Sequence, residues 1–297
     1  MTGRTTIVTG ANSGIGRAAA SALAAAGARV VLAVRSTEKG RDAAASMPGH
    51  TEVRQLDLAS LESVRGFAAE WSGEIDILIN NAGVMVPPLT RTPEGFELQF
   101  GTNHLGHFAL TNLLLEQVTG RVVTVSSTAH RMGRIDFEDL NWQRKRYRAW
   151  SAYGQSKLAN LLFTAELQRR LTEAGSDVLA TAAHPGYAAT NLQFHSESKI
   201  QDLFSHLSNR LLGQSEEGGA LPTLYAATAE VPGNSFAGPS GFMEQRGPAK
   251  LVGRSVAAQD MDVARRLWEA SEEMTGIAFG LGGRDGEPAM SSGKAGT

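Results

Sequence analysis

Short β-branched runs alternate with amphipathic helical stretches over the first 183 residues of the chain. This alternation is typical of βαβ units, in which parallel strands form a sheet and the helices pack on its faces. The strand candidates are Thr6–Val8, Arg29–Ala33, Glu52–Leu56, Ile75–Ile79, Arg121–Val125 and Asp177–Ala183. The helix candidates are Ile15–Ala26, Glu38–Ala45, Leu61–Trp71, Phe96–Gln117 and Ala152–Leu171. The pattern therefore predicts an α/β fold, a doubly wound parallel sheet flanked by helices.

The domain organisation follows from the distribution of linker-like and apolar segments. No linker rich in proline and serine divides the 297 residues, so we expect a single domain over residues 1–283. Residues 187–230 are expected to form a substrate loop and lid region. Apolar residues at helical spacing between Tyr187 and Leu212 fit either a helix packed on the core or an apolar lid over a ligand. Residues 284–297 are rich in glycine and serine, which predicts a disordered tail.

Charge and cysteine content exclude several classes of function. The 28 basic and 30 acidic side chains give a net charge of -2, which provides no field for nucleic acid or an anionic membrane. The absence of cysteine excludes disulfides, thiolate metal sites and cysteine nucleophiles. The first strand begins too early to leave room for a secretory signal, and the apolar runs are too short to cross a bilayer. We therefore expect a cytoplasmic protein that acts on a small molecule.

A glycine-rich turn, residues 9–16, follows the first predicted strand and opens a helix. Its spacing is Gly-x-x-x-Gly-x-Gly. Glycines let the backbone approach a pyrophosphate closely, and the free amides of a helix N-terminus attract it. A turn of this kind without a ligand is the alternative. We interpret the turn as part of a dinucleotide site, with contacts expected from Gly10, Asn12, Ser13, Gly14, Ile15 and Gly16.

The residue after the second predicted strand distinguishes between two nicotinamide dinucleotides. An acidic side chain at this place binds the ribose 2′-hydroxyl of NAD, whereas a basic one accommodates the 2′-phosphate of NADP. The chain has Arg35 here and no carboxylate before Glu38. A solvated arginine at a strand end is the alternative, but a guanidinium pairs well with phosphate. Arg35 therefore predicts NADP(H) in preference to NAD(H).

Tyr153 and Lys157 lie four residues apart in a predicted helix and so share a face, although a surface pair of this spacing also arises by chance. Hydride delivery to a carbonyl carbon leaves an alkoxide, so the oxygen needs a proton donor such as a phenol of lowered pKa. We expect the Lys157 ammonium to lower the pKa of Tyr153 and to orient the cofactor ribose. Ser127, at the end of a predicted strand, is placed to hydrogen-bond the substrate oxygen.

Together these segments resemble the short-chain dehydrogenase/reductase family, and within it the retinol dehydrogenase and WW-domain oxidoreductase branch. The matching motifs occupy residues 9–16, 57–60, 80–85, 103–108, 125–127, 153–160 and 184–186. The resemblance implies a Rossmann-type fold and a catalytic set of Asn103, Ser127, Tyr153 and Lys157, in which Asn103 orders a water near Lys157. It also implies cofactor contacts from Asp57, Leu58, Asn81, Ala82, Gly83, Tyr153, Lys157, Pro185, Gly186 and Thr190.

From these residues we expect an NADPH-dependent oxidoreductase that transfers a hydride between nicotinamide and the carbonyl, or primary or secondary alcohol, of an apolar substrate. Tyr153 would act as the general acid and base. Two alternatives stay open, a redox-neutral epimerase that uses the bound cofactor and a non-catalytic NADP(H)-binding regulator. An intact catalytic set argues against the regulator.

The segment before Tyr153 and the histidines bear on partners and metals. The segment between Ser127 and Tyr153 is longer than in most family members, and its basic run, residues 144–148, either binds an anionic partner or is a solvated loop. Because this insertion precedes a helix that many relatives use for dimerisation, both a monomer and a homodimer are compatible with it. His104, His107, His130 and His184 are spread over several predicted elements without a matching carboxylate cluster, so we expect core histidines and no metal site.

Overall fold

Eight strands form one sheet in the part of the chain that the computed structural model describes, residues 1–186 and 215–281. Their order is β3-β2-β1-β4-β5-β6-β7-β8. The strands are β1 Thr5–Thr9, β2 Arg29–Val34, β3 His50–Gln55, β4 Ile75–Asn80, β5 Val118–Val125, β6 Leu179–Ala183, β7 Phe236–Pro239 and β8 Ala249–Leu251. All neighbours from β3 to β7 pair in parallel, and β8 pairs antiparallel with β7. The predicted doubly wound fold is confirmed, with an antiparallel edge strand added.

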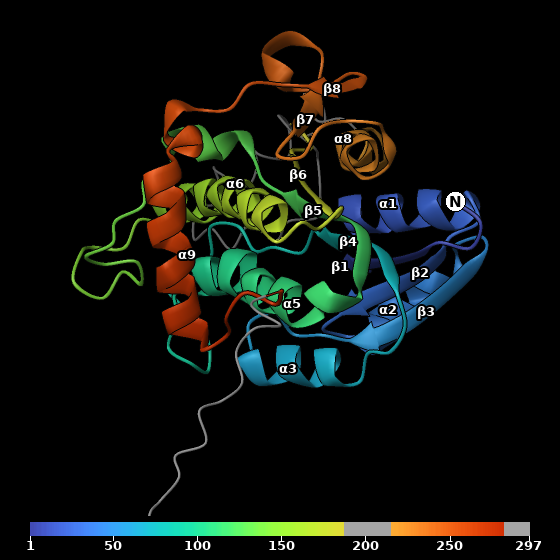
Figure 1. Cartoon of the computed structure of the whole chain (residues 1–297), viewed down its shortest axis with the longest axis horizontal. Coiled ribbons are helices and arrows are strands. Elements are labelled where there is room, and N and C mark those ends of the chain that lie inside the picture. Colours follow the sequence, from blue (N-terminus) through green and yellow to red (C-terminus); the bar gives the residue numbers. More distant parts are fainter. Residues whose placement is uncertain (187–214, 282–297) are drawn as a thin grey trace, which may run out of the picture.

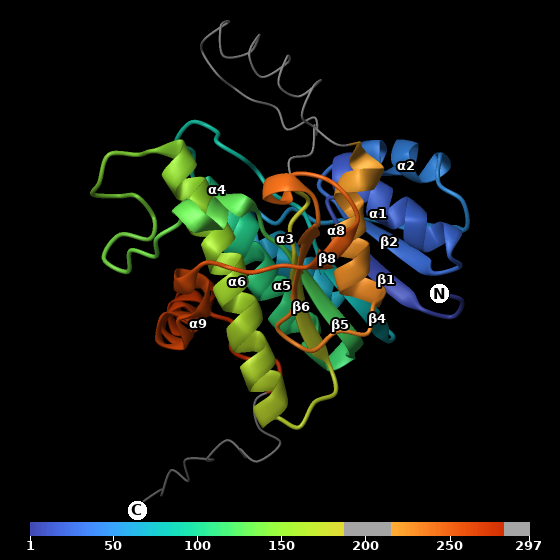
Figure 2. The ribbon, with the colours of Figure 1, turned by 90° about the horizontal axis from the view of Figure 1, so that it is seen from above.

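Helices cover both faces of this sheet (Figure 1). They are α1 Gly14–Ala25, α2 Thr37–Ala45, α3 Leu61–Ala69, α4 Leu98–Phe100, α5 Gly106–Leu114, α6 Ala149–Glu173, α8 Glu216–Thr228 and α9 Met261–Thr275. In the view of Figure 2, α1 and α8 lie on one side of the strands and α6 and α9 on the other. Across the described ranges, 1–186 and 215–281, no helix combines the length and the apolar character needed to cross a membrane.

The predicted single helix Phe96–Gln117 is wrong in detail. The segment divides into α4, a π-helical turn Gly101–Leu105, α5 and a short 3-10 turn Leu115–Gln117. Gly106, at the junction, packs so closely on the loop after β3 that a Cβ there would overlap the carbonyl oxygen of Leu58. The helical register in this region is therefore fixed by packing against another part of the chain, which the local sequence does not encode.

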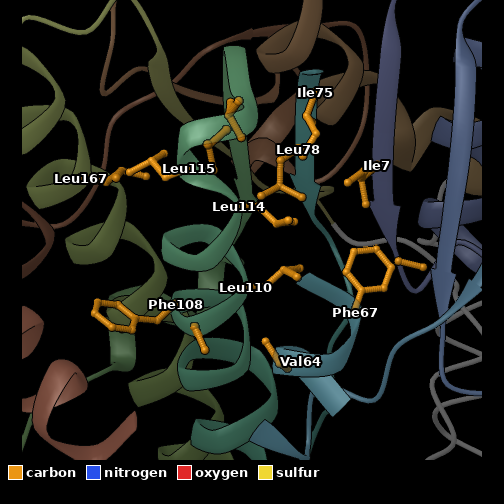
Figure 3. Packing of buried hydrophobic residues seen from close by; sticks show 14 of the residues in the cluster. Ile7, Val64, Phe67, Ile75, Leu78, Phe108, Leu110, Leu114, Leu115 and Leu167 are labelled. Atoms are coloured by element: carbon orange, nitrogen blue, oxygen red, sulfur yellow. The ribbon is translucent and has the colours of Figure 1, made fainter. Parts of the chain in front are cut away.

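Alternating side chains of the strands fill two hydrophobic clusters, one on each face of the sheet. On β1, Ile7 faces the cluster that contains residues of α3, α5 and α6, while Val8 faces the cluster beneath α1, α2 and α8. Figure 3 shows the first cluster, in which Leu110 of α5 points toward α3 and the sheet, and Phe108 points from the other side of α5 toward α6 and α9. Burial on both faces explains why these strands consist of nearly continuous apolar runs.

The expected substrate loop and lid region, residues 187–230, is only partly described. Residues 216–228 form α8, which packs against α1 and the strands β5, β6 and β7 and so belongs to the helical layer. The apolar run between Tyr187 and Leu212, and Thr190 within it, lie outside the described residues. The expected tail, residues 284–297, lies outside them as well.

The close approach at Gly106 generates a stability prediction. Gly106→Ala should lower the free energy of unfolding by about 1–3 kcal/mol, because the added methyl forces α5 away from Leu58. Gly66→Ala is the matched control, since Gly66 is exposed within α3 and a Cβ there meets nothing within 4 Å. The control should stabilise the protein by about 0.5–1 kcal/mol. Urea unfolding followed by circular dichroism measures both values, and equal effects would contradict the packing argument.

Candidate active site

A cavity of about 260 Å³ opens at the carboxyl ends of β1, β4, β5 and β6. It lies where the strand order reverses, between β1 and β4, which is where doubly wound sheets bind their ligands. The cavity brings most of the predicted site residues together. Its lining consists of Gly10, Asn12, Ser13, Gly14, Ile15, Gly16, Asn81, Ala82, Gly83, Val84, Met85, Val125, Ser126, Tyr153, Lys157 and Pro185.

The glycine-rich turn forms one wall of this cavity and has the geometry that a pyrophosphate requires. Gly10 and Gly14 have φ angles of 66° and 57°, in the left-handed region that favours glycine. A Cβ at Gly16 would overlap the side-chain amide of Asn81. The N-cap residue of α1, Ser13, makes no side-chain bond to the first-turn amides, so these donors face the cavity without a capping group. The residues present therefore fit a dinucleotide.

A hydrogen-bonded node at Thr9 joins the two walls. The Thr9 hydroxyl accepts from the backbone amides of Asn81 and Ala82, both at 2.9 Å, and lies 2.9 Å from Nε2 of His107. His107 Nδ1 lies 3.0 Å from the backbone oxygen of Asn103, which can only accept, so Nδ1 carries the proton. Burial lowers the pKa of His107 to about 4, so the ring is neutral and Nε2 accepts from Thr9. From the sequence, His107 was expected to be a core residue, and this link was not predicted.

Three bonds fix α6 against the end of β5. Lys157 Nζ and Asn160 Nδ2 both donate to the backbone oxygen of Val125, each at 3.1 Å. The Ser126 hydroxyl donates to the backbone oxygen of Lys157 at 2.7 Å. Because the helix is held at this point, Tyr153 and Lys157 both line the cavity. Their predicted juxtaposition is present, with Lys157 Nζ 5.7 Å from the centre of the Tyr153 ring.

Burial shifts the pKa values of this pair in opposite directions. It raises the pKa of Tyr153 to about 12, and a hydrogen bond from the Ser127 hydroxyl opposes the rise. It lowers the pKa of Lys157 to about 8. The expectation that Lys157 lowers the pKa of Tyr153 is therefore not met in this structure, because the ammonium bonds to Val125 and desolvation of the phenol dominates. Tyr153 retains its proton at neutral pH, the state required of a proton donor.

Asn103 and Ser127 do not line the cavity, but each bonds a residue that does, Val84 and Tyr153 respectively. Asn103 Nδ2 donates to the backbone oxygen of Val84 at 3.0 Å and to the Ser156 hydroxyl at 2.9 Å, while its Oδ1 accepts from Val84 N at 2.8 Å. Asn103 lies in the π-helical turn, and turns of this kind are frequent at functional sites. Ser127 follows β5, and its hydroxyl accepts from Ala129 N at 3.2 Å while contacting the phenol of Tyr153. The proposed water relay through Asn103 stays a prediction.

The residues expected at the adenosine end lie beyond the cavity. Arg35 is exposed and follows β2 directly. Asp57 follows β3, and its Oδ1 accepts from Ala59 N at 3.0 Å. The side chain of Leu58 belongs to the hydrophobic core, so only its backbone is available to a ligand. Arg35 follows β2, which pairs with β1, while Asp57 and Leu58 follow β3, the next strand outward.

The histidines are distributed through the structure. Within residues 1–186 and 215–281, no three histidine, aspartate or glutamate side chains gather as a metal site would require. His104, His107, His130 and His184 are all buried. His184 Nδ1 accepts from Gly186 N at 3.2 Å and so helps to fix the turn that contains Pro185 and Gly186.

Comparison with known proteins agrees with this geometry. Residues 4–201 match the family model described as short chain dehydrogenase. Retinol dehydrogenase 13 of Homo sapiens is 46% identical over 299 residues, which cover 93% of this chain and 85% of that protein. A crystal structure of an uncharacterized protein from Mycobacterium paratuberculosis has 52% identity and a TM-score of 0.82, covering 94% of this chain and 95% of that one. The Pseudomonas aeruginosa RhlG/NADP active-site complex has 25% identity and a TM-score of 0.62, covering 80% and 94%.

The match to the family model covers well over half of the chain, and the similarity to human retinol dehydrogenase 13 extends over nearly all of it. Members of this family bind a nicotinamide cofactor. This chain therefore belongs to the short-chain dehydrogenase/reductase family, as a retinol dehydrogenase-like oxidoreductase that acts on CH–OH or C=O groups.

Proposed function

We propose that the protein is a cytoplasmic, NADPH-dependent reductase of apolar ketones or aldehydes, with Tyr153 as the proton donor. The observation that carries the proposal is a buried phenol at the wall of a glycine-lined cavity, with a lysine amine and a serine hydroxyl beside it. The bound nicotinamide supplies the hydride. This chain must bind the substrate oxygen, provide its proton and exclude water.

Each catalytic side chain has a distinct part in this proposal. Tyr153 gives its Oη proton to the substrate oxygen, and in the opposite direction its phenolate takes the proton of the alcohol. The Ser127 hydroxyl hydrogen-bonds the same oxygen and stabilises the charge that develops on it. Lys157, held by Val125, is placed to bind a ribose hydroxyl and to favour the phenolate once it forms. The raised pKa of Tyr153 supports the reductive direction near neutral pH.

Arg35 supports NADPH over NADH. The neighbouring Ser36 hydroxyl accepts from Lys39 N and caps α2, so it is already engaged. Arg35 is exposed at the carboxyl end of β2 and is the basic group closest in sequence to the strand end. The RhlG complex shows that a related fold binds NADP.

Exposed apolar side chains near the catalytic residues support an apolar substrate. Trp150 is 52% exposed, and its ring centre lies 6.2 Å from that of Tyr153, edge to face. A second cavity, of about 400 Å³, is lined by Thr128, Arg131, Gly186, Met243, Glu244 and Gln245. Thr128 follows Ser127, and Met243 is 70% exposed. Large apolar groups beside a reaction centre are well suited to bind an aliphatic or polycyclic carbonyl compound.

The role of Tyr153 is tested by Tyr153→Phe. Turnover of NADPH with ketones should fall by about a hundredfold or more, because the substrate oxygen loses its proton donor. The dissociation constant for NADPH should stay within about twofold, since the aromatic ring is kept. Tyr225→Phe on α8 is the matched control and should retain full activity. Absorbance of reduced nicotinamide gives the rates, and a Tyr153→Phe enzyme with unchanged turnover would refute the assignment.

The same assay separates the alternatives. A wild-type enzyme that binds NADPH tightly but consumes none with any carbonyl compound would be a regulator or an epimerase. Inversion of a substrate alcohol centre without net NADPH consumption would identify the epimerase.

Cofactor preference is tested by Arg35→Ala. The KM for NADPH should rise by about tenfold, because a charge-assisted contact to the 2′-phosphate is lost. The KM for NADH should change little, because NADH lacks that phosphate. Lys39→Ala removes an exposed basic residue from the same stretch and should leave both KM values unchanged. Equal effects of Arg35→Ala on the two cofactors would show that Arg35 does not select between them.

Trp150 provides a test of the substrate class. Trp150→Ala should raise the KM for a bicyclic ketone by about five- to tenfold, because the substrate loses an aromatic contact surface. The KM for a small aliphatic ketone and for NADPH should stay the same. Leu221→Ala, which truncates an exposed leucine on α8, is the control. Loss of activity with all substrates alike would mean that Trp150 supports Tyr153 rather than binding substrate.

A further inference from the structure

The cavity wall that follows β4 contains a strained residue. Val86 has a φ angle of 56°, in the left-handed region that β-branched residues rarely adopt. Val84 and Met85, immediately before it, line the cavity. A strained turn persists only where the surroundings hold it in place. The question is therefore which groups hold this wall.

Two side chains from one helical segment hold the wall, four residues apart. Asn103 bonds both backbone groups of Val84, as described above. Gln99 Oε1 accepts from the amide of the strained Val86 at 2.8 Å. Both side chains are fully buried. The wall is thus fixed at two points. From the sequence, Asn103 was expected to order a water near Lys157, and neither wall contact was predicted.

The orientation of the Gln99 amide is set by its other partners. Its Nε2 donates to the Tyr147 hydroxyl and to the backbone oxygen of Ala149, both at 2.9 Å. A flipped amide would place an acceptor against the Ala149 carbonyl and a donor against the Val86 amide. Tyr147 and Ala149 therefore lock Gln99 in the orientation that binds Val86. Ala149 is the first residue of α6, the helix that carries Tyr153.

Tyr147 is held in turn by a buried carboxylate. The Tyr147 hydroxyl donates to Oε1 of Glu97 at 3.0 Å and accepts from Nε2 of Gln99. Glu97 is fully buried. Glu97 also accepts from the backbone amides of Gln99 and Phe100 and so caps α4. The Tyr147 ring packs edge to face against Trp142, with centres 5.6 Å apart. The polar atoms of Glu97 and Gln99 that face Tyr147 thus all take part in hydrogen bonds.

The position of Tyr147 assigns a structural role to the insertion between Ser127 and Tyr153. The insertion projects as a loop beside α6 (Figure 2). Within its basic run, Arg144, Arg146 and Arg148 are exposed, whereas Tyr147 is half-buried and turned toward Gln99. The arginines thus lie on the solvent side, and the tyrosine faces the site. This arrangement accounts for the insertion without an anionic partner.

We propose that Gln99 and Tyr147 are positioning residues that hold the Val84–Val86 wall of the cofactor cavity and the first turn of α6 in a fixed geometry. They act through the wall and through Tyr153, and neither touches the reacting atoms. The inference about catalysis rests on the proposed function, while the inference about the wall rests on the hydrogen bonds alone.

Tyr147→Phe tests the proposal, because it keeps the ring and removes only the hydroxyl. The dissociation constant for NADPH should rise by about fivefold and kcat should fall by about tenfold, since small misplacements of reacting groups have large effects on rate. Hydrogen–deuterium exchange of the amides of residues 84–86 should become faster. Arg146→Ala, in the same insertion but exposed, is the matched control and should change none of these values.

A second variant removes the same contacts from the other side chain, so the result does not depend on how well position 147 accepts a substitution. Gln99→Met keeps a side chain of similar length and removes all three polar contacts, so it should reproduce the effects of Tyr147→Phe. Because the two residues act through one another, the double variant should lose about as much as the larger single loss, instead of the product of both. Multiplicative losses, or a lowered Tm with unchanged exchange at residues 84–86 and unchanged NADPH affinity, would overturn the proposal.

These outcomes are distinct from failure of the proposed function. If the wild-type protein reduces no carbonyl compound, the reductase assignment fails. Exchange rates and NADPH affinity still report whether Gln99 and Tyr147 hold the wall.

Discussion

The reversal of strand order between β1 and β4 is the constraint on which the site depends. Chain segments leaving these neighbouring strands turn to opposite faces of the sheet, and the space between them opens at the carboxyl edge. The two backbones stay together because the Thr9 hydroxyl accepts from the amides of Asn81 and Ala82. Its own proton goes to neutral His107, which in turn bonds the backbone of Asn103. One threonine thus connects the glycine-rich turn, the opposite wall and the π-helical turn.

Burial shifts the pKa values of Tyr153 and Lys157 in opposite directions. Excluding water raises the pKa of the Tyr153 phenol to about 12 and lowers that of the Lys157 ammonium to about 8, because each charged form is penalised. In the proposed reaction, the phenol therefore keeps its proton until an alkoxide develops beside it. Ser127 opposes this effect locally by bonding the phenol oxygen. The same desolvation strengthens each hydrogen bond made to the substrate oxygen.

Much of the fold was predictable because its central strands, such as β1, β2 and β4, are buried on both faces and so are rich in apolar residues. The strands β7 and β8 were missed, since β7 is short and contains Gly238 and Pro239, and β8 is an exposed edge of three residues. The π-helical turn was missed because Gly106 meets Leu58 only in the folded chain. In the site, the glycine turn and the residues Ser127, Tyr153 and Lys157 were identified from motifs, whereas His107 resembled an ordinary core histidine.

Tyr147 was missed for a different reason, and it shows where sequence reasoning loses information. Four basic residues surround it, so the local composition indicates a solvated loop. Its partners, Glu97 and Gln99, belong to a helix start some fifty positions earlier in the chain. A buried carboxylate is costly unless donors surround it, and here the helix amides and the tyrosine hydroxyl provide them. The buried carboxylate thus needs the Tyr147 hydroxyl as a donor. Through this hydroxyl, the insertion is connected to the wall of the cofactor cavity and to the first turn of α6. Variation in this insertion can therefore alter the active site from a distance, through hydrogen bonds that a helix and a loop make only after both have folded.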